Sequence, residues 1–149
     1  DHLPTMVRWH GPFAKMPDVF RGFMLYFVSQ EFKDIVEHHE PGVHQFFPVE
    51  AYGNDSHATG HMYLLNICQR LDGVNRQAST AKLDMFWEYG SGSVVFDLNA
   101  LKNFHLWVDK HIYGHGFYVS EAIHTAIVDA KLTGFKFRKE LTTGGNGNG

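Results

Sequence analysis

The sequence has few of the features that mark a protein held together by covalent links or driven by charge. A single cysteine, Cys68, excludes an internal disulfide and fits a reducing compartment. The 13 basic and 16 acidic side chains leave a formal charge of −3 at pH 7, which gives no strong attraction toward nucleic acid or anionic lipid. No apolar run approaches the roughly 18 residues that a membrane-spanning helix requires. We therefore expect a cytoplasmic protein without a nucleic-acid or membrane partner.

What the sequence does contain is enough apolar material for a hydrophobic core. Hydrophobic residues make up 44% of the chain and aromatic residues 15%, against 19% charged residues, which is a globular composition. Prolines and glycines in residues 1–22 predict a loop-like N-terminal arm anchored by Trp9 and Phe13. Residues 142–149 have no apolar side chain, so a disordered tail is predicted there. A single domain is expected between them, over residues 23–141.

One segment near the N-terminus has the pattern of a strand, a helix and a second strand. Residues 24–28 form a short apolar run, and Ser29 then offers a side-chain oxygen to the free amides at the start of a helix. Apolar residues follow at helical spacing along one stripe: Phe32, Ile35 and Val36. Gly42 ends the helix. Residues 43–52 are predicted to form a strand, in which Pro48 favours an edge position or a bulge.

A second segment near the C-terminus repeats this order. Residues 116–119 are apolar, Ser120 is a second capping residue, and apolar residues again follow at helical spacing. They are Ile123, Ala126, Ile127 and Ala130. Gly134 is expected to close this helix, and Phe135 and Phe137 lie on one face of a predicted final strand. Whether the two segments arose by duplication stays open, since many α/β proteins use this order of elements.

The middle of the chain is predicted to be rich in strands. Residues 62–68 are apolar at odd and even positions, as in an interior strand covered on two sides, which would bury Cys68. Residues 84–89 and 94–98 flank a Gly-Ser segment, which predicts a β-hairpin. Together these segments predict an α+β (mixed α/β) fold with a mixed central sheet of about five or six strands and two capped amphipathic helices.

The eleven histidines suggest a metal or catalytic site, but their surroundings argue against one. The pairs His57/His61 and His111/His115 have the i, i+4 spacing of metal ligands on a helix, yet a glycine interrupts each pair. No zinc-protease, nucleophile-elbow, phosphate-loop or dinucleotide motif is present. We therefore predict no cofactor, no metal and no catalytic residue. The alternative is a histidine- or metal-dependent hydrolase or transferase that uses His57, His61, His105 or His111 with Asp109.

Residues 104–111 have the pattern of a binding surface. In a strand, Phe104, Leu106 and Val108 would share one face and leave polar and aromatic side chains on the other. Those side chains are His105, Trp107, Asp109 and His111. Because tryptophan is enriched among residues that dominate binding, we predict partner contacts at His105, Trp107 and Asp109. The alternative is that this face is covered as well, with the indole N–H bonded to a nearby acceptor.

Acidic side chains are concentrated between residues 25 and 60. This segment contains one base, Lys33, and six acids, namely Glu31, Asp34, Glu37, Glu40, Glu50 and Asp55. Such a segment could steer a basic partner, although acids on the outer face of a helix are also the ordinary solvated state. We predict partner contacts at Glu37, Glu40, Glu50 and Asp55. If the partner binds nucleic acid, these carboxylates could imitate phosphate groups.

Four blocks of sequence stand out by their order along the chain. They are VSQEFKDIVEHHEPGVHQFFPVE (28–50), YLLNICQRLDGVNRQAS (63–79), VVFDLNALKNFHLWVDKH (94–111) and FYVSEAIHTAIVDAKLTGFKF (117–137). In this order they resemble a bacterial family of polymorphic-toxin immunity proteins, earlier catalogued as a domain of unknown function. The positions that match the family are Ser29, Gly42, Phe47, Pro48, Trp107, Asp109, Ser120 and Gly134.

The resemblance implies a small cytoplasmic protein that binds a cognate toxin domain and neutralises it without turnover. Caps, turns and core packing account for most of the matched positions, whereas Trp107 and Asp109 have no such local reason. A regulatory interaction domain without a toxin partner is a further alternative. Neither the residues nor the resemblance fixes the toxin, the contact surface or the oligomeric state.

Overall fold

The computed structural model describes residues 3–11, 15–53 and 58–144. Contacts within the chain divide it into two compact units. The first unit comprises residues 1–68 and 121–136, and the second comprises residues 69–120 and 137–149. Helices and antiparallel strands occur together, and the principal sheet has five strands, so the predicted α+β class with a mixed sheet is confirmed. The predicted boundaries at residues 22 and 141 remain predictions.

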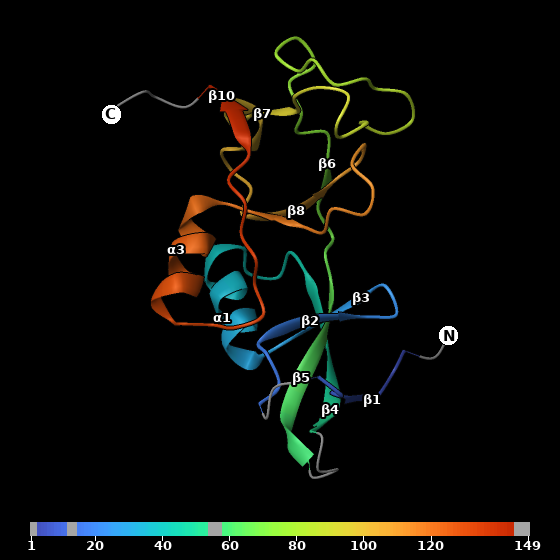
Figure 1. The fold of residues 1–149 in the computed structure, drawn as a ribbon. Helices are drawn as coiled ribbons and strands as arrows, with labels where there is room; N and C mark the ends of the chain where they lie inside the picture. The colour runs from blue at the N-terminus through green and yellow to red at the C-terminus, as the bar shows by residue number, and fades with distance from the viewer. Residues whose placement is uncertain (1–2, 12–14, 54–57, 145–149) are drawn as a thin grey trace. The chain divides into compact units, whose positions relative to one another are not determined.

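A five-stranded mixed sheet forms the body of the first unit (Figure 1). Its strands are β1 (Met6–Arg8), β2 (Val19–Gly22), β3 (Leu25–Val28), β4 (Gln45–Tyr52) and β5 (Ala58–Asn66). Their order across the sheet is β1-β4-β5-β3-β2, with β1 parallel to β4 and the other pairs antiparallel. The apolar strand expected in the interior is therefore confirmed as β5, the central strand. It ends at Asn66, two residues before Cys68.

One face of this sheet carries a hydrophobic core. Side chains alternate between the two faces along each strand, so every second residue of β4 and β5 points into this core. Its buried members are Phe27, Val49, Ala51, Met62 and Leu64, and Phe20 and Phe47 pack against them. Pro48 lies opposite Tyr63 of β5, and β1 pairs with β4 only from Glu50 onward. At Pro48 the edge of β4 that faces β1 is therefore unpaired, and the lack of an N–H at proline breaks no hydrogen bond between the strands.

Helix α1 (Gln30–His39) forms where the capping pattern predicts it. The Phe32 amide donates to Ser29 Oγ at 3.2 Å, and the apolar stripe buries Phe32 and Val36 completely. The helix contacts β5 on the face opposite to the core described above, and it also packs against α3 (Glu121–Asp129). Gly42, at φ +71°, makes the turn into β4. The first strand-helix-strand segment is thus confirmed.

The second segment departs from its prediction after α3. The helix buries Ile123 and Ile127, but it does not extend to Gly134. Lys131 adopts a left-handed conformation with φ +54°, its amide donates to the Val128 carbonyl, and the Leu132 amide donates to the Ile127 carbonyl. This is a Schellman motif with lysine where glycine is usual. The prediction that Gly134 closes the helix is therefore wrong.

Gly134 and the residues after it follow a different course from the one predicted. Gly134 has φ +91°, and a Cβ there would lie 2.2 Å from the Val19 carbonyl oxygen, so glycine permits this close approach. Thr133 bonds to Asp18 through its amide, at 2.7 Å, and its hydroxyl. The predicted strand at Phe135 and Phe137 is wrong, because residues 134–140 form no strand. Ser120 directly precedes α3, and its capping role stays a prediction.

Short strands and ordered loops make up the second unit. Its elements are β6 (Arg70–Leu71), β7 (Val95–Asp97), α2 (Leu98–Leu101), β8 (Leu106–Asp109), β9 (Tyr118–Val119) and β10 (Leu141–Thr143). β8 lies between β6 and β9, and β10 pairs with β7 in parallel. The core of this unit contains Val74, Ala81, Trp87, Val94, Phe96, Leu101 and Trp107. Most of these residues come from loops. The second unit is therefore held together more by the burial of side chains than by hydrogen bonds between strands.

Three predictions of local structure are corrected here. Residues 84–89 form no strand, so the hairpin with 94–98 is wrong; the Trp87 amide donates instead to the His111 carbonyl. The N-terminal arm is not a loop throughout, because β1 and β2 are strands of the main sheet. Trp9 packs on Phe20, with 5.2 Å between the centres of the two rings, whereas Phe13 lies outside the described residues. In the predicted tail, residues 142–143 belong to β10 and residues 145–149 are not described.

Replacing the cap of α1 should lower the stability of the fold. In Ser29→Ala the Phe32 amide loses its acceptor inside a buried region, and we expect the free energy of unfolding to fall by about 1 kcal/mol. Urea unfolding followed by circular dichroism measures the change. Ser29→Thr keeps a hydroxyl at this position and should retain most of the stability. Equal losses in the two variants would contradict the capping role.

Candidate functional site

Part of the main sheet presents its second face to solvent. Cross-strand partners share a face, and the register aligns Met6 with Glu50 and Glu50 with His61. We call this part of the sheet the open face. Its residues are Met6, Arg8, Pro48, Glu50, Tyr52, His61 and Tyr63, all of them exposed or half-buried. They come from β1, β4 and β5, which lie side by side in the lower part of Figure 1.

Contacts among neighbouring side chains hold the open face in place. The Tyr52 hydroxyl donates to Glu50 Oε2 at 2.9 Å, and this hydrogen bond to the carboxylate raises the pKa of Tyr52. The Arg8 guanidinium lies 5.7 Å from the centre of the Tyr52 ring, within the range of a cation–π contact. At the border with α1, the Lys33 ammonium lies 5.4 Å from the Tyr63 ring. These side chains therefore lose less entropy if a partner covers them.

The composition of the open face is suited to protein recognition. Tyrosine, arginine and methionine are enriched in protein interfaces, tyrosine and arginine also in their hot spots, and each occurs here. Glu50 adds an exposed carboxylate that can accept hydrogen bonds from a basic side chain. In the sequence, this surface is indicated only by the alternation in residues 48–52, where Val49 and Ala51 are small apolar residues between Pro48, Glu50 and Tyr52. The contributions of Met6 and Arg8 were not predicted, because the sequence gives no sign that residues 6–8 join β4.

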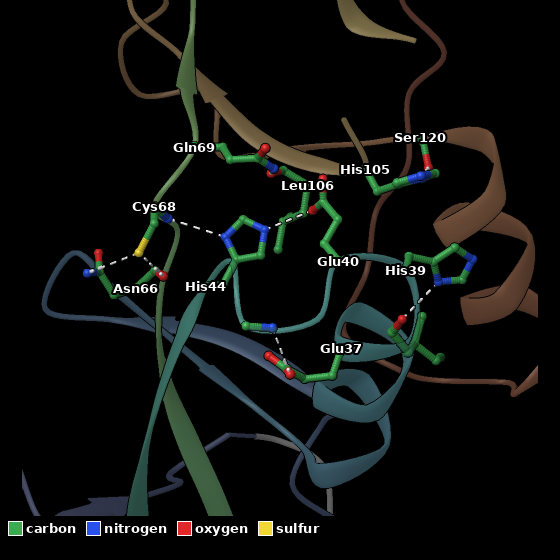
Figure 2. Close-up of polar contacts among 12 residues, drawn as sticks. Glu37, His39, Glu40, His44, Asn66, Cys68, Gln69, His105, Leu106 and Ser120 are labelled. Atoms are coloured by element: carbon green, nitrogen blue, oxygen red, sulfur yellow. Dashed lines mark hydrogen bonds and ion pairs between the residues drawn. The ribbon is translucent and has the colours of Figure 1, made fainter. Parts of the chain in front are cut away.

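Two of the predicted partner-binding acids are bonded within the fold instead (Figure 2). Glu40 is buried, and its Oε2 lies 2.9 Å from His44 Nε2. His44 Nδ1 accepts a hydrogen bond from the Cys68 amide at 3.2 Å, so Nδ1 carries no proton and Nε2 donates to Glu40. Glu37 accepts a hydrogen bond from the Gly42 amide at 3.2 Å. Both carboxylates thus stabilise the turn after α1.

The remaining predicted acids differ in their accessibility. Glu50 is exposed on the open face, whereas Asp55 lies outside the described residues. Partner contact at all four acids stays a prediction; of the three that the structure describes, Glu50 is exposed, Glu37 is half-buried and Glu40 is buried. The thiol of Cys68 is exposed as well, which corrects the prediction that it is buried in a strand. The strand ends at Asn66, and the Cys68 amide donates to the His44 side chain.

Removing the Glu40 carboxylate should destabilise the protein. Glu40→Ala leaves the His44 Nε2–H without its acceptor in a side chain that is completely buried, so we expect a loss of about 1–3 kcal/mol in the free energy of unfolding. Urea unfolding of the purified variant gives the value. Glu40→Gln offers an amide oxygen at the same distance and should lose clearly less. If alanine and glutamine behaved alike, the hydrogen bond to His44 would not be the source of the effect.

The other predicted contact residues lie in the second unit, where two of them are buried. Trp107 is 6% exposed and Asp109 is 3% exposed. Asp109 uses both carboxylate oxygens, accepting from the Gly73 amide at 2.9 Å and from the His111 amide at 2.8 Å. It thereby fixes two loops around β8. His105 is half-buried, and its Nδ1 lies 2.8 Å from Ser120 Oγ.

Trp107 belongs to the core of the second unit. Its ring stacks on Tyr118 at 5.8 Å. Among the described residues its indole N–H has no hydrogen-bond acceptor, which differs from the bonded indole considered as the alternative for a covered face. The burial of Trp107 and Asp109 supports a structural role for both. Direct partner contact at these residues and at His105 stays a prediction.

The tyrosine pair beside Trp107 gives this unit a specific response to alkaline pH. Tyr118 and Tyr89 approach each other through their hydroxyls at 3.5 Å. Burial raises the pKa of Tyr118 strongly, because a phenolate is poorly solvated there, and the Tyr89 hydroxyl raises it further. Burial also raises the pKa of Tyr89. Both phenols therefore stay protonated in the folded chain at a pH where an unfolded chain begins to lose these protons.

The stability of the protein should consequently fall above about pH 10, the ordinary tyrosine pKa. Below that pH both states keep the proton, and above it only the folded state does, so each raised pKa contributes up to about 1.4 kcal/mol of loss per pH unit. Urea unfolding at pH 9, 10 and 11 measures the slope. Tyr118→Phe should flatten it, whereas Tyr113→Phe, at an exposed tyrosine, should leave it unchanged. An unchanged slope in Tyr118→Phe would contradict the assignment.

The described histidines that were considered for an enzyme are divided between the two units. His61 lies on the open face, whereas His105 and His111 belong to the second unit. His111 Nδ1 lies 3.2 Å from the Met85 carbonyl, and its Nε2 lies 3.7 Å from Asp72. His57 is outside the described residues. No group of three or more metal-ligating side chains was found in the described part of the chain.

Comparison with known proteins identifies a family for most of the chain. A family described as "Immunity protein family (Imm11)" matches residues 4–142. No curated protein matches the chain with significant similarity. Within the described ranges, no helix is both long enough and apolar enough to cross a membrane. The family match spans both units, so it concerns the open face and the loops around β8 alike.

Proposed function

The chain belongs to the Imm11 immunity protein family, and we propose that it binds a cognate bacterial toxin and neutralises it by forming a stoichiometric complex. The observation that carries this proposal is the family match over residues 4–142. An immunity protein of this kind needs a preformed surface and no turnover. The open face, held by the Tyr52–Glu50 hydrogen bond and the Arg8–Tyr52 contact, supplies such a surface.

We assign the toxin contact to the open face because it combines interface-type side chains with an accessible carboxylate. The exposed Glu50 carboxylate favours a basic group of the partner at that position. A toxin that acts on nucleic acid would have such charge at its active site. Glu50, placed opposite that site, would occupy a phosphate position and exclude the substrate. Glu40 is left out of the contact because its carboxylate is already used within the fold.

The proposal places the protein in the cytoplasm of the cell that makes the toxin. Polymorphic toxins act between competing bacteria, and the immunity protein protects the producer and its kin. The gene should therefore lie beside a gene for a large secreted protein with a variable C-terminal domain. That C-terminal domain is the cognate toxin for the experiments below.

Co-expression with the neighbouring toxin domain tests the proposed function. We expect cells that make both proteins to grow and cells that make the toxin alone to stop growing. The two purified proteins should elute together at a one-to-one ratio in size-exclusion chromatography. Growth rescue without a complex, by substoichiometric protein that turns over a substrate, would contradict the proposal and favour the enzymatic alternative.

Charge reversal at the open face tests the assigned surface. Glu50→Lys should weaken toxin binding by about tenfold or more, since a hydrogen bond to a charged group is lost and repulsion from a basic site is added. Isothermal titration calorimetry measures the affinity. Asp129→Lys is the matched control, because it reverses an exposed acid at the end of α3, outside the open face, and it should leave the affinity unchanged. Undiminished affinity in Glu50→Lys would remove the open face from the contact.

A further inference from the structure

The turn between β2 and β3 has an unfavourable backbone conformation. The register pairs Gly22 with Leu25, so only Phe23 and Met24 form the loop of the hairpin. Both have positive φ angles, +51° and +68°. A two-residue hairpin loop with two positive φ angles is a type I′ turn, which strongly prefers Asn-Gly. A residue with a Cβ is strained in this region, and a bulky one especially so.

The same two residues expose a large apolar surface. Phe23 is 99% exposed and Met24 is 65% exposed. Neither contributes to the core of the first unit. A hairpin needs neither side chain for its stability, and Asn-Gly would make the same turn without strain or apolar exposure. Strained backbone and exposed apolar side chains at one place indicate a function outside the isolated fold.

Polar and aromatic neighbours complete the chemistry of this turn. An Arg21 guanidinium nitrogen lies 3.3 Å from Met24 Sδ, and the guanidinium lies 5.7 Å from the centre of the Tyr26 ring. Phenylalanine, methionine, arginine and tyrosine are among the side chains enriched in protein interfaces. By the strand register, Arg21 and Tyr26 lie on the same side of the sheet as Glu50. Arg21 and Tyr26, which flank the turn, therefore face the same side of the sheet as the open face, and α1 also packs on that side.

We propose that Phe23 and Met24, which we call the β2–β3 tip, insert into an apolar pocket of the cognate toxin, with Arg21 bonding to acceptor groups at the rim of that pocket. This inference rests on the proposed function. The tip is a protrusion from a two-residue loop, so its partner must be concave. Arg21 is the one charged side chain in β2, β3 and their turn, whereas membrane docking generally requires a cluster of basic residues. A protein pocket is thus the occupant that these observations favour.

A double substitution separates binding from folding at the tip. Phe23→Asn with Met24→Gly supplies the residues that the turn prefers, so the variant should fold and its Tm should rise by a few degrees. Its affinity for the toxin domain should fall by at least about 30-fold, the loss expected for a binding hot spot. Tyr113→Asn, which changes another exposed aromatic residue, should bind as tightly as the parent chain.

Calorimetry with the purified toxin domain distinguishes the outcomes. If the parent chain binds and the double variant binds equally well, the tip inference is overturned and the proposed function stands. If the parent chain does not bind the toxin domain, the proposed function and the tip inference are both overturned. An equal loss in Tyr113→Asn would overturn the assignment to the tip. Two further measurements test other occupants of the tip. Sedimentation of the chain alone would overturn the inference if the parent chain self-associated and the double variant did not. Flotation with anionic phospholipid vesicles would overturn it if the parent chain bound the vesicles and the double variant did not.

Discussion

The antiparallel pairing of β4 with β5 is the constraint on which the first unit depends. It aligns residues 45–52 with residues 58–66 and so fixes which side chains lie on each face. One set, with Val49 and Met62, enters the core, and the other set, with Glu50 and His61, forms the open face. A shift of one residue would exchange the two sets. Core packing therefore holds the open face in position, and an exposed side chain on these strands has a fixed orientation before any partner binds.

The sequence predicts the first unit better than the second, for a physical reason. In the segment from Leu25 to Tyr52, a cap, a helical stripe and an alternating strand all indicate the same structure, and that structure forms. In the second unit, Trp87 and Val74 reach the core from loops, whose course depends on contacts distant in sequence. The predicted hairpin followed local alternation and failed. β10 pairs with β7 across more than forty residues, and no local pattern can indicate that pairing.

Charge and residue type in the sequence did not show which acids are used within the fold. Glu40 was predicted to be a partner contact, but the His44 imidazole four residues later accounts for its carboxylate. Asp109 likewise bonds to two backbone amides of its own unit. A sequence cannot separate an acid that serves the fold from one that serves a partner, because both uses require the same carboxylate. The exposure of each side chain in the structure distinguishes acids used within the fold from acids that a partner can reach. It also shows that Phe23 and Met24 lie at the surface, although their apolar character alone would assign them to a core.

The path of the chain between the two units limits how the protein can be divided. The first unit is left at Cys68, entered again at Glu121 and left once more after Lys136. A fragment that stops at residue 120 would therefore lack α3, which packs on α1. The apolar side chains of α1 would then be exposed to solvent. Neither unit corresponds to one continuous piece of gene. Recombination would therefore need more than one crossover within the gene to exchange either unit.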